Sequence, residues 1–164
     1  MKPKTMASYL PALTKIIEAT DQTGTKMNPD FEKLRQAIDK GQVSELGTDT
    51  LTEIKTTFQT GTDTYTENVN RLQQASVPVR ILGRHKQLVG AYRNYAEACQ
   101  AMVDAIDPEG QSVNVDAFND SEHEQENMME KNYRDNPTNH GNRDVMLMVP
   151  GSMLLGIGFD ILTN

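Results

Sequence analysis

Apolar residues recur at helical spacing along most of the chain. The most regular series lies within residues 78–107 and steps by alternate intervals of three and four: Leu82, His85, Val89, Tyr92, Ala96, Cys99, Val103 and Ile106. This is the a/d pattern of a heptad repeat. A second series beside it, at the g positions, repeats every seventh residue: Ile81, Leu88, Tyr95 and Met102. Because the g positions are apolar as well, the pattern predicts a helix of a bundle rather than half of a two-stranded coil.

The b and c positions of the same helix carry small residues, namely Gly83, Gly90, Ala91, Ala98 and Ala105. Alanine is common on exposed helix surfaces, but each glycine inside a helix costs about 1 kcal/mol. The two glycines therefore favour the close approach of a neighbouring helix along this flank.

A second long helix is expected over residues 48–75, antiparallel to the helix over 78–107. Thr50 and Glu53 have capping-box spacing at its start. Threonine is dense in the middle, and a strand over residues 60–66 is the alternative. Neither face of that strand would be apolar, so we favour a helix with a kink near Gly61.

Two shorter helices are expected before this pair. The first spans residues 8–19 and is interrupted by the polar stretch 21–25. The second begins with Asn28 as its cap and Pro29 as its first position. Gly41 ends it.

The C-terminal part begins with a turn over residues 107–110 and a polar helix over 122–133, with Ser121 and Glu124 as its capping pair. Residues 136–142 have the composition of a loop. The apolar stretch 145–162 is expected to form a hairpin or a short helix. Its uncharged run, 145–159, is shorter than the roughly 20 residues of a membrane span. We therefore expect it to be buried against the bundle.

The predicted fold is thus all-α, a helical bundle built around the long antiparallel pair 48–75 and 78–107. Residues 1–135 would form the bundle domain, with 136–164 packed on the same domain. Aromatic residues make up 5% of the chain and Trp is absent, while there are nine Met. Such a core suits helices better than a β-sandwich. The methionines favour a surface that adapts to a partner.

Charge and cysteine content narrow the classes of function. The net charge of -7 argues against nucleic-acid binding, which relies on a cationic surface. The single cysteine, Cys99, excludes an intramolecular disulfide framework and a cysteine-based metal site. The N-terminal residues lack the pattern of a signal peptide, so a cytoplasmic protein is expected.

Few residues suggest chemistry. His85 and Cys99 share the apolar seam and are interpreted as core residues, since neither has an activating partner nearby in the sequence. Glu122, Glu126 and Glu130 share one helical face with His123 beside them, but the chain has no Glu-x-x-His motif of bundle metal sites. We therefore expect a solvated acidic face, and no catalytic residue, metal or cofactor.

A charge asymmetry is the clearest remaining feature. No acidic residue occurs between Glu67 and Glu97, whereas the segment 97–130 is strongly acidic. The cations in and near this gap are Arg71, Arg80, Arg84, Lys86 and Arg93. They form either a patch for an anionic partner or an internal complement to the acidic segment.

Three functions are weighed. The first is a non-enzymatic protein–protein interaction or scaffolding module, binding a protein partner or a second copy as a homodimer. The second is a small-molecule-binding or enzymatic bundle with an internal site formed by His85, Tyr92, Tyr95 and Arg84. The third is a secreted helical-hairpin protein, based on the general shape of the long pair. It lacks the Trp-x-Gly turn of type VII secretion hairpins, because the chain contains no Trp.

Overall fold

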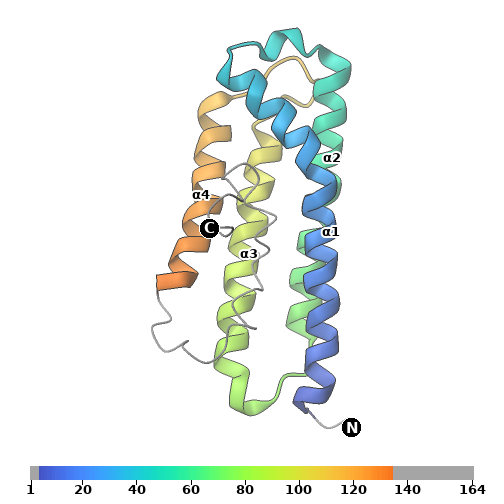
Figure 1. The fold of residues 1–164 in the computed structure, drawn as a ribbon, viewed down its shortest axis with the longest axis vertical. Helices are drawn as coiled ribbons and strands as arrows, with labels where there is room; N and C mark the ends of the chain where they lie inside the picture. The colour runs from blue at the N-terminus through green and yellow to red at the C-terminus, as the bar shows by residue number, and fades with distance from the viewer. Residues whose placement is uncertain (1–3, 135–164) are drawn as a thin grey trace, which may run out of the picture.

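The computed structural model describes residues 4–134 of the chain, and this part is an all-α bundle. Its helices are α1 (Met6–Asp39), α2 (Thr48–Gln74), α3 (Leu82–Asp104) and α4 (Val115–Arg134). Two short 3-10 turns, η1 (Val43–Glu45) and η2 (Val79–Ile81), lie in the connections. Successive helices run in opposite directions (Figure 1), so the fold is an up-and-down bundle. We call the end where α1 begins and α2 turns into α3 the lower end.

The predicted long antiparallel pair is confirmed as α2 and α3. Side-chain contacts show that the two helices are antiparallel, because the start of α2 meets the end of α3 and the end of α2 meets the start of α3. Near the upper end, the Lys55 ammonium donates to the Val103 and Ile106 carbonyls at 2.9 and 2.6 Å. At the lower end, a ring nitrogen of His85 lies 2.9 Å from the Leu72 carbonyl. The helix expected over 60–66 in place of a strand is also confirmed, since these residues lie within α2.

The two N-terminal helices expected over 8–19 and from Asn28 to Gly41 are wrong, because α1 is one continuous helix containing Pro11 and Pro29. Its buried residues keep a spacing of three and four throughout: Tyr9, Leu13, Ile16, Thr20, Gly24, Met27, Phe31, Leu34 and Ile38. Thr20 and Gly24 break the apolar pattern in the sequence but are buried in the structure. Burial of this stripe outweighs the cost of Pro29, which has no N–H for the helix hydrogen bond. The upper part of α1 changes direction (Figure 1).

The predicted helix caps in the second half are corrected as well. The helix α2 begins after Gly47 and has no side-chain cap, so Thr50 and Glu53 form no capping box there. The helix α4 begins at Val115, well before the expected start at residue 122. The Asn114 side chain accepts a hydrogen bond from the Ala117 N–H at 3.0 Å. Ser121 is a buried residue inside the helix rather than its cap.

The stripe predicted on α3 is largely confirmed. All its a and d positions from His85 to Ile106 are buried, whereas Leu82 in the first turn remains 40% exposed. The close packing predicted on the b and c flank is not seen at Gly83 and Gly90 among residues 4–134, since a Cβ added at either would meet none of their atoms within 4 Å. Ala98 and Ala105 of the same flank are buried. A close approach between helices occurs instead at Gly61 of α2, where an added Cβ would meet the Met27 side chain of α1.

No helix within residues 4–134 has the length and hydrophobicity that crossing a membrane requires. The apolar segment 145–162, for which a hairpin or a short helix was expected, lies outside the described residues.

The α3 seam gives a direct test of the fold. Val103 is 1% exposed, so Val103→Asp would bury a carboxylate, a cost of several kcal/mol that exceeds much of a typical domain's stability. We expect this variant to lose its cooperative thermal transition, measured by circular dichroism. Ala101→Asp is the matched control, because Ala101 is exposed on the same helix, and it should melt like the parent. A Val103→Asp protein that melts like the parent would contradict the central position of α3.

Candidate functional site

A cluster of polar side chains lies in the core between α1, α2 and α3, and we call Thr20, Asn68 and Tyr92 the core polar cluster. The Tyr92 hydroxyl lies 2.6 Å from the Thr20 hydroxyl, and the Asn68 amide donates to it at 3.1 Å. Thr20 in turn donates to the Ile16 carbonyl of its own helix at 2.6 Å. All three side chains are buried, so these bonds replace water for groups that would otherwise be unpaired.

His85 is buried two turns below this cluster, as expected for a core position. One ring nitrogen, Nδ1, lies 2.9 Å from the Tyr9 hydroxyl, and Nε2 lies 2.9 Å from the Leu72 carbonyl. The Tyr9 ring also meets the imidazole edge-on, with 5.5 Å between the ring centroids. Both nitrogens therefore have protein partners, and His85 joins the starts of α1 and α3 to the end of α2.

Tyr95 and Cys99 lie on the opposite side of Tyr92 from His85. Burial raises the pKa of the Cys99 thiol to about 12. Burial also raises the pKa of the Tyr92 and Tyr95 hydroxyls above their ordinary value. A nucleophilic cysteine requires the thiolate, and an acid or base is effective when its pKa lies near the working pH. These three groups stay neutral at physiological pH and act as core residues.

The four residues predicted to form an internal ligand site are not brought together. His85, Tyr92 and Tyr95 are buried, and Tyr95 reaches α4, where its hydroxyl lies 3.5 Å from the Gln125 side-chain oxygen. Arg84 is exposed. Three buried side-chain oxygens, Asn28 Oδ1, Thr62 Oγ1 and Asn68 Oδ1, have no hydrogen-bond partner among the described residues.

The five cations predicted as an anionic-partner patch are all exposed. Arg71 of α2 pairs with Glu67 at 3.4 Å. On α3, Lys86 is two positions from Arg84, which at about 100° per residue places them on different sides of the helix. Arg84 is instead four positions from Leu88 and three from Ile81, so these three share a face.

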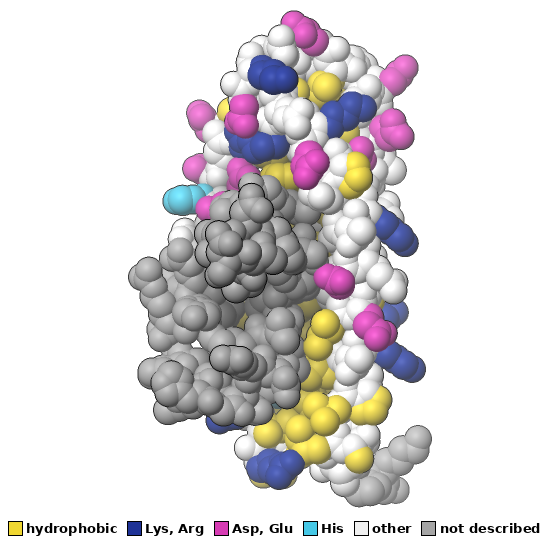
Figure 2. Space-filling view, viewed as in Figure 1, with side chains coloured by type: hydrophobic (Ala, Val, Ile, Leu, Met, Phe, Trp, Pro, Cys, Tyr) yellow, Lys and Arg dark blue, Asp and Glu magenta, His cyan; other side chains and the backbone are white. Residues whose placement is uncertain are grey.

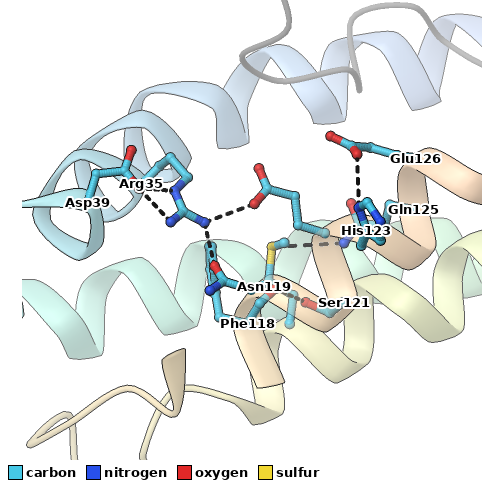
Figure 3. A network of polar contacts seen from close by, with 10 residues as sticks. Arg35, Asp39, Phe118, Asn119, Ser121, His123, Gln125 and Glu126 are labelled. Atoms are coloured by element: carbon cyan, nitrogen blue, oxygen red, sulfur yellow. Dashed lines mark hydrogen bonds and ion pairs between the residues drawn. The ribbon is translucent and has the colours of Figure 1, made fainter. Parts of the chain in front are cut away.

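The most connected charged group is Arg35 of α1, which joins α1 to α4. Its guanidinium donates to Asp39 at 2.6 Å, to Glu122 at 2.9 Å and to Asn119 at 2.8 Å. Figure 3 shows it between Asp39 and the first turns of α4, beside the ring of Phe118. The Arg35 Cζ atom lies 5.6 Å from the Phe118 ring centroid. Glu122, expected on a solvated acidic face, therefore anchors α4 to α1.

The seam that α4 covers in the upper half continues below it as an apolar surface. We call Met6, Leu10 and Ile17 of α1, with Ile81 and Leu88 at the start of α3, the lower apolar face. Ile17 lies 18 residues before Arg35, which is about five helical turns and hence the same side of α1. Leu88 lies two turns before Tyr95 on the side of α3 that contacts α4. Leu10 is 47% exposed. Figure 2 shows hydrophobic side chains gathered at this end of the viewed face.

Sequence reasoning missed three of these features. Thr20 and Asn68 lie at helical spacing from core residues, which is a signal of burial. Their polar side chains concealed that signal in the sequence. The Arg35 contacts join positions more than 80 residues apart, and no local pattern predicts them. The apolar g positions of α3 indicated a neighbouring helix. They did not show that α4 covers Tyr95 and leaves Leu88 partly exposed.

Cys99 should give the protein a measurable pH dependence of stability. Burial raises the thiol pKa from 9.0 to about 12, so above about pH 9 the unfolded chain loses this proton while the folded protein keeps it. The free energy of unfolding should fall as pH rises, by up to about 1.4 kcal/mol per pH unit. The slope between about pH 9 and 10 should be smaller in Cys99→Ala, measured by urea unfolding. Equal slopes in the two proteins would contradict the buried neutral thiol.

The Arg35 contacts can be tested by a double-mutant cycle. Glu122 is partly buried, and its pKa is raised by burial and lowered by Arg35. Arg35→Met leaves this carboxylate without its cation, so we expect a loss of about 1–3 kcal/mol of unfolding free energy in urea. Adding Glu122→Gln should recover part of the loss. The exposed pair is the control, and Arg71→Met should cost less than about 1 kcal/mol. Additive effects of Arg35→Met and Glu122→Gln would show that the two side chains are not coupled.

Comparison of the chain with protein-family models, with curated proteins and with solved structures gives no match in any of the three. The geometry and chemistry of its own residues are therefore what bears on its function. Two features stand out within residues 4–134, a core whose polar groups are bonded mainly to one another and an apolar face below the contacts of α4.

Proposed function

We propose that the protein is a non-enzymatic helical interaction module that binds an amphipathic helix of a protein partner on the lower apolar face. The observation that carries the proposal is the continuation of the α1–α3 seam below the α4 contacts, with Leu10 47% exposed. Apolar side chains gathered in one place on a surface are typical of protein-binding sites. The reducing cytoplasm is the compartment we propose, in keeping with the single cysteine.

The packing of α4 supports a helix as the occupant. In the upper half this helix lies against the same sides of α1 and α3 that form the lower apolar face. Its anchor there is Phe118, which is fully buried and stacks on Phe31 with 6.1 Å between centroids. A partner helix with one large apolar anchor per two turns would repeat this mode of packing.

Charge supports a partner helix with an acidic flank. Arg84 borders Ile81 and Leu88 and is exposed, so it is placed to meet a carboxylate at the edge of the bound helix. In the upper half, Arg35 of α1 meets Glu122 of α4 in the same manner. A nucleic-acid partner is disfavoured, because the chain carries a net charge of -7 and its surface would repel the phosphates.

An enzymatic or ligand-binding role has less support. His85 and Tyr92 use their polar atoms in contacts with α1 and α2, and the raised pKa of the Cys99 thiol keeps it protonated. The three unpartnered oxygens within residues 4–134, of Asn28, Thr62 and Asn68, are too few to orient a substrate by themselves.

The proposal is tested by photo-crosslinking in the cells that naturally make the protein. A benzoylphenylalanine in place of Leu10 should give one defined adduct, identified by mass spectrometry as a protein containing an amphipathic helix with acidic residues. Arg84→Glu in the same protein should lower the adduct yield about tenfold, equivalent to about 1.4 kcal/mol of binding free energy.

The matched control places the crosslinker at Val115, which is 38% exposed at the upper end of the bundle. It should not give the adduct seen at position 10. Identical adducts at both positions, or none at position 10, would overturn the proposal. An adduct of twice the chain's own mass would show that a second copy, rather than another protein, occupies the face.

A further inference from the structure

The chain that follows α4 has a composition suited to the lower apolar face. The helix α4 descends toward that face (Figure 1) and ends at Arg134. Residues 135–144 are polar, and residues 145–159 form an uncharged run rich in Val, Leu, Ile and Met. An uncharged apolar run of this length is costly to leave in water, at about 0.8 kcal/mol for each exposed CH₂ group.

The polar segment is long enough for the apolar run to reach this surface. Ten residues lie between 135 and 144, and at about 3.3 Å per residue they span up to about 33 Å. The lower apolar face extends from Met6 to Ile17 along α1, a rise of about 16 Å at 1.5 Å per residue. The linker is therefore longer than the surface it would have to cross.

Tethering favours the chain's own segment over that of a second copy as the occupant of the lower apolar face. A segment tethered through only ten residues has an effective concentration of about millimolar, far above that of a separate protein molecule in solution. We infer that residues 145–162 cover the lower apolar face of their own chain when no partner is bound. This inference rests on the proposed function only for the surface that it uses.

The consequence is a built-in competition for the proposed binding surface. The segment carries no charge before Asp160, so over residues 145–159 it has nothing to pair with Arg84. A partner helix with an acidic flank gains that pairing and can displace the segment. The apparent affinity for the partner equals the intrinsic affinity multiplied by the fraction of time that the segment leaves the face uncovered.

Paramagnetic NMR on the full chain tests this directly. A nitroxide label is placed at Ser152→Cys, where cysteine is close in size to serine. Cys99 is buried and its thiol pKa is about 12, so it should remain unlabelled. If the segment is docked for most of the time, the methyl signals of Leu10, Ile17, Ile81 and Leu88 should lose at least about half their intensity relative to the reduced label. The Val43 and Leu46 methyls of the upper end should keep theirs.

Four controls fix the interpretation. Leu10→Lys should restore the signals of Ile17 and Leu88, whereas Val115→Lys should leave them broadened. Unlabelled wild type treated with the nitroxide reagent should show no broadening. In a mixture of isotope-labelled wild type and spin-labelled, isotope-free Ser152→Cys protein, only docking between chains broadens the signals, so we expect none.

Two outcomes overturn the inference. Full intensity at all four methyl groups would show that the segment does not cover the face. Broadening in the mixed sample equal to that in the single-species sample would show that the segment of a second copy covers it. Neither outcome bears on the proposed partner, since the adduct at position 10 reports on that separately.

Discussion

Polar groups along the seam between α2 and α3 can be satisfied in one register only, and the rest of the bundle is built on that register. Lys55 donates to the Val103 and Ile106 carbonyls at and just after the end of α3. The Asn68 amide donates to the Tyr92 hydroxyl, and His85 contacts the Leu72 carbonyl. Moving one helix by a turn, about 5.4 Å, would break these bonds together. A buried donor or acceptor without a partner costs about 1–3 kcal/mol, so apolar packing alone would tolerate a shift that these polar groups do not. The first helix is fixed by the same groups, since Thr20 meets Tyr92 and Tyr9 meets His85.

The long pair was predictable because its signal is local. The helix α3 has apolar residues at nearly every a, d and g position, and turn residues separate it from its neighbours on both sides. The helix α1 was not predictable in the same way, because Thr20 and Gly24 are polar or featureless in the sequence, and Pro29 is typical of a helix start. In the structure the Thr20 hydroxyl donates to the Ile16 carbonyl and accepts from the Tyr92 hydroxyl, so Thr20 behaves as a core residue. Tertiary burial decided the continuity of α1, and burial of this kind has no signature within a window of one helix.

The candidate site divides in the same manner. His85 and Cys99 were predicted as core residues from their places in the seam, and both are buried. Their partners were beyond sequence reasoning, because Tyr9 and Leu72 lie on other helices. The acidic helix was expected to face solvent, yet Arg35 holds Glu122 against α1. Charges that pair across a bundle cannot be matched from composition, since many cations could serve each carboxylate equally well.

The lower apolar face arises because α4 covers the seam of α1 and α3 in the upper half of the bundle and not in the lower half. In the upper half, Phe118 and the Arg35 contacts hold α4 across the seam of α1 and α3. The same sides of both helices stay apolar below, where Met6, Leu10 and Leu88 remain at least partly exposed. Leu10 is 47% exposed, so a charged residue there would cost little in stability if this surface were only solvated. An apolar residue there favours an occupant of the surface, and α4 descends toward the same end of the bundle (Figure 1).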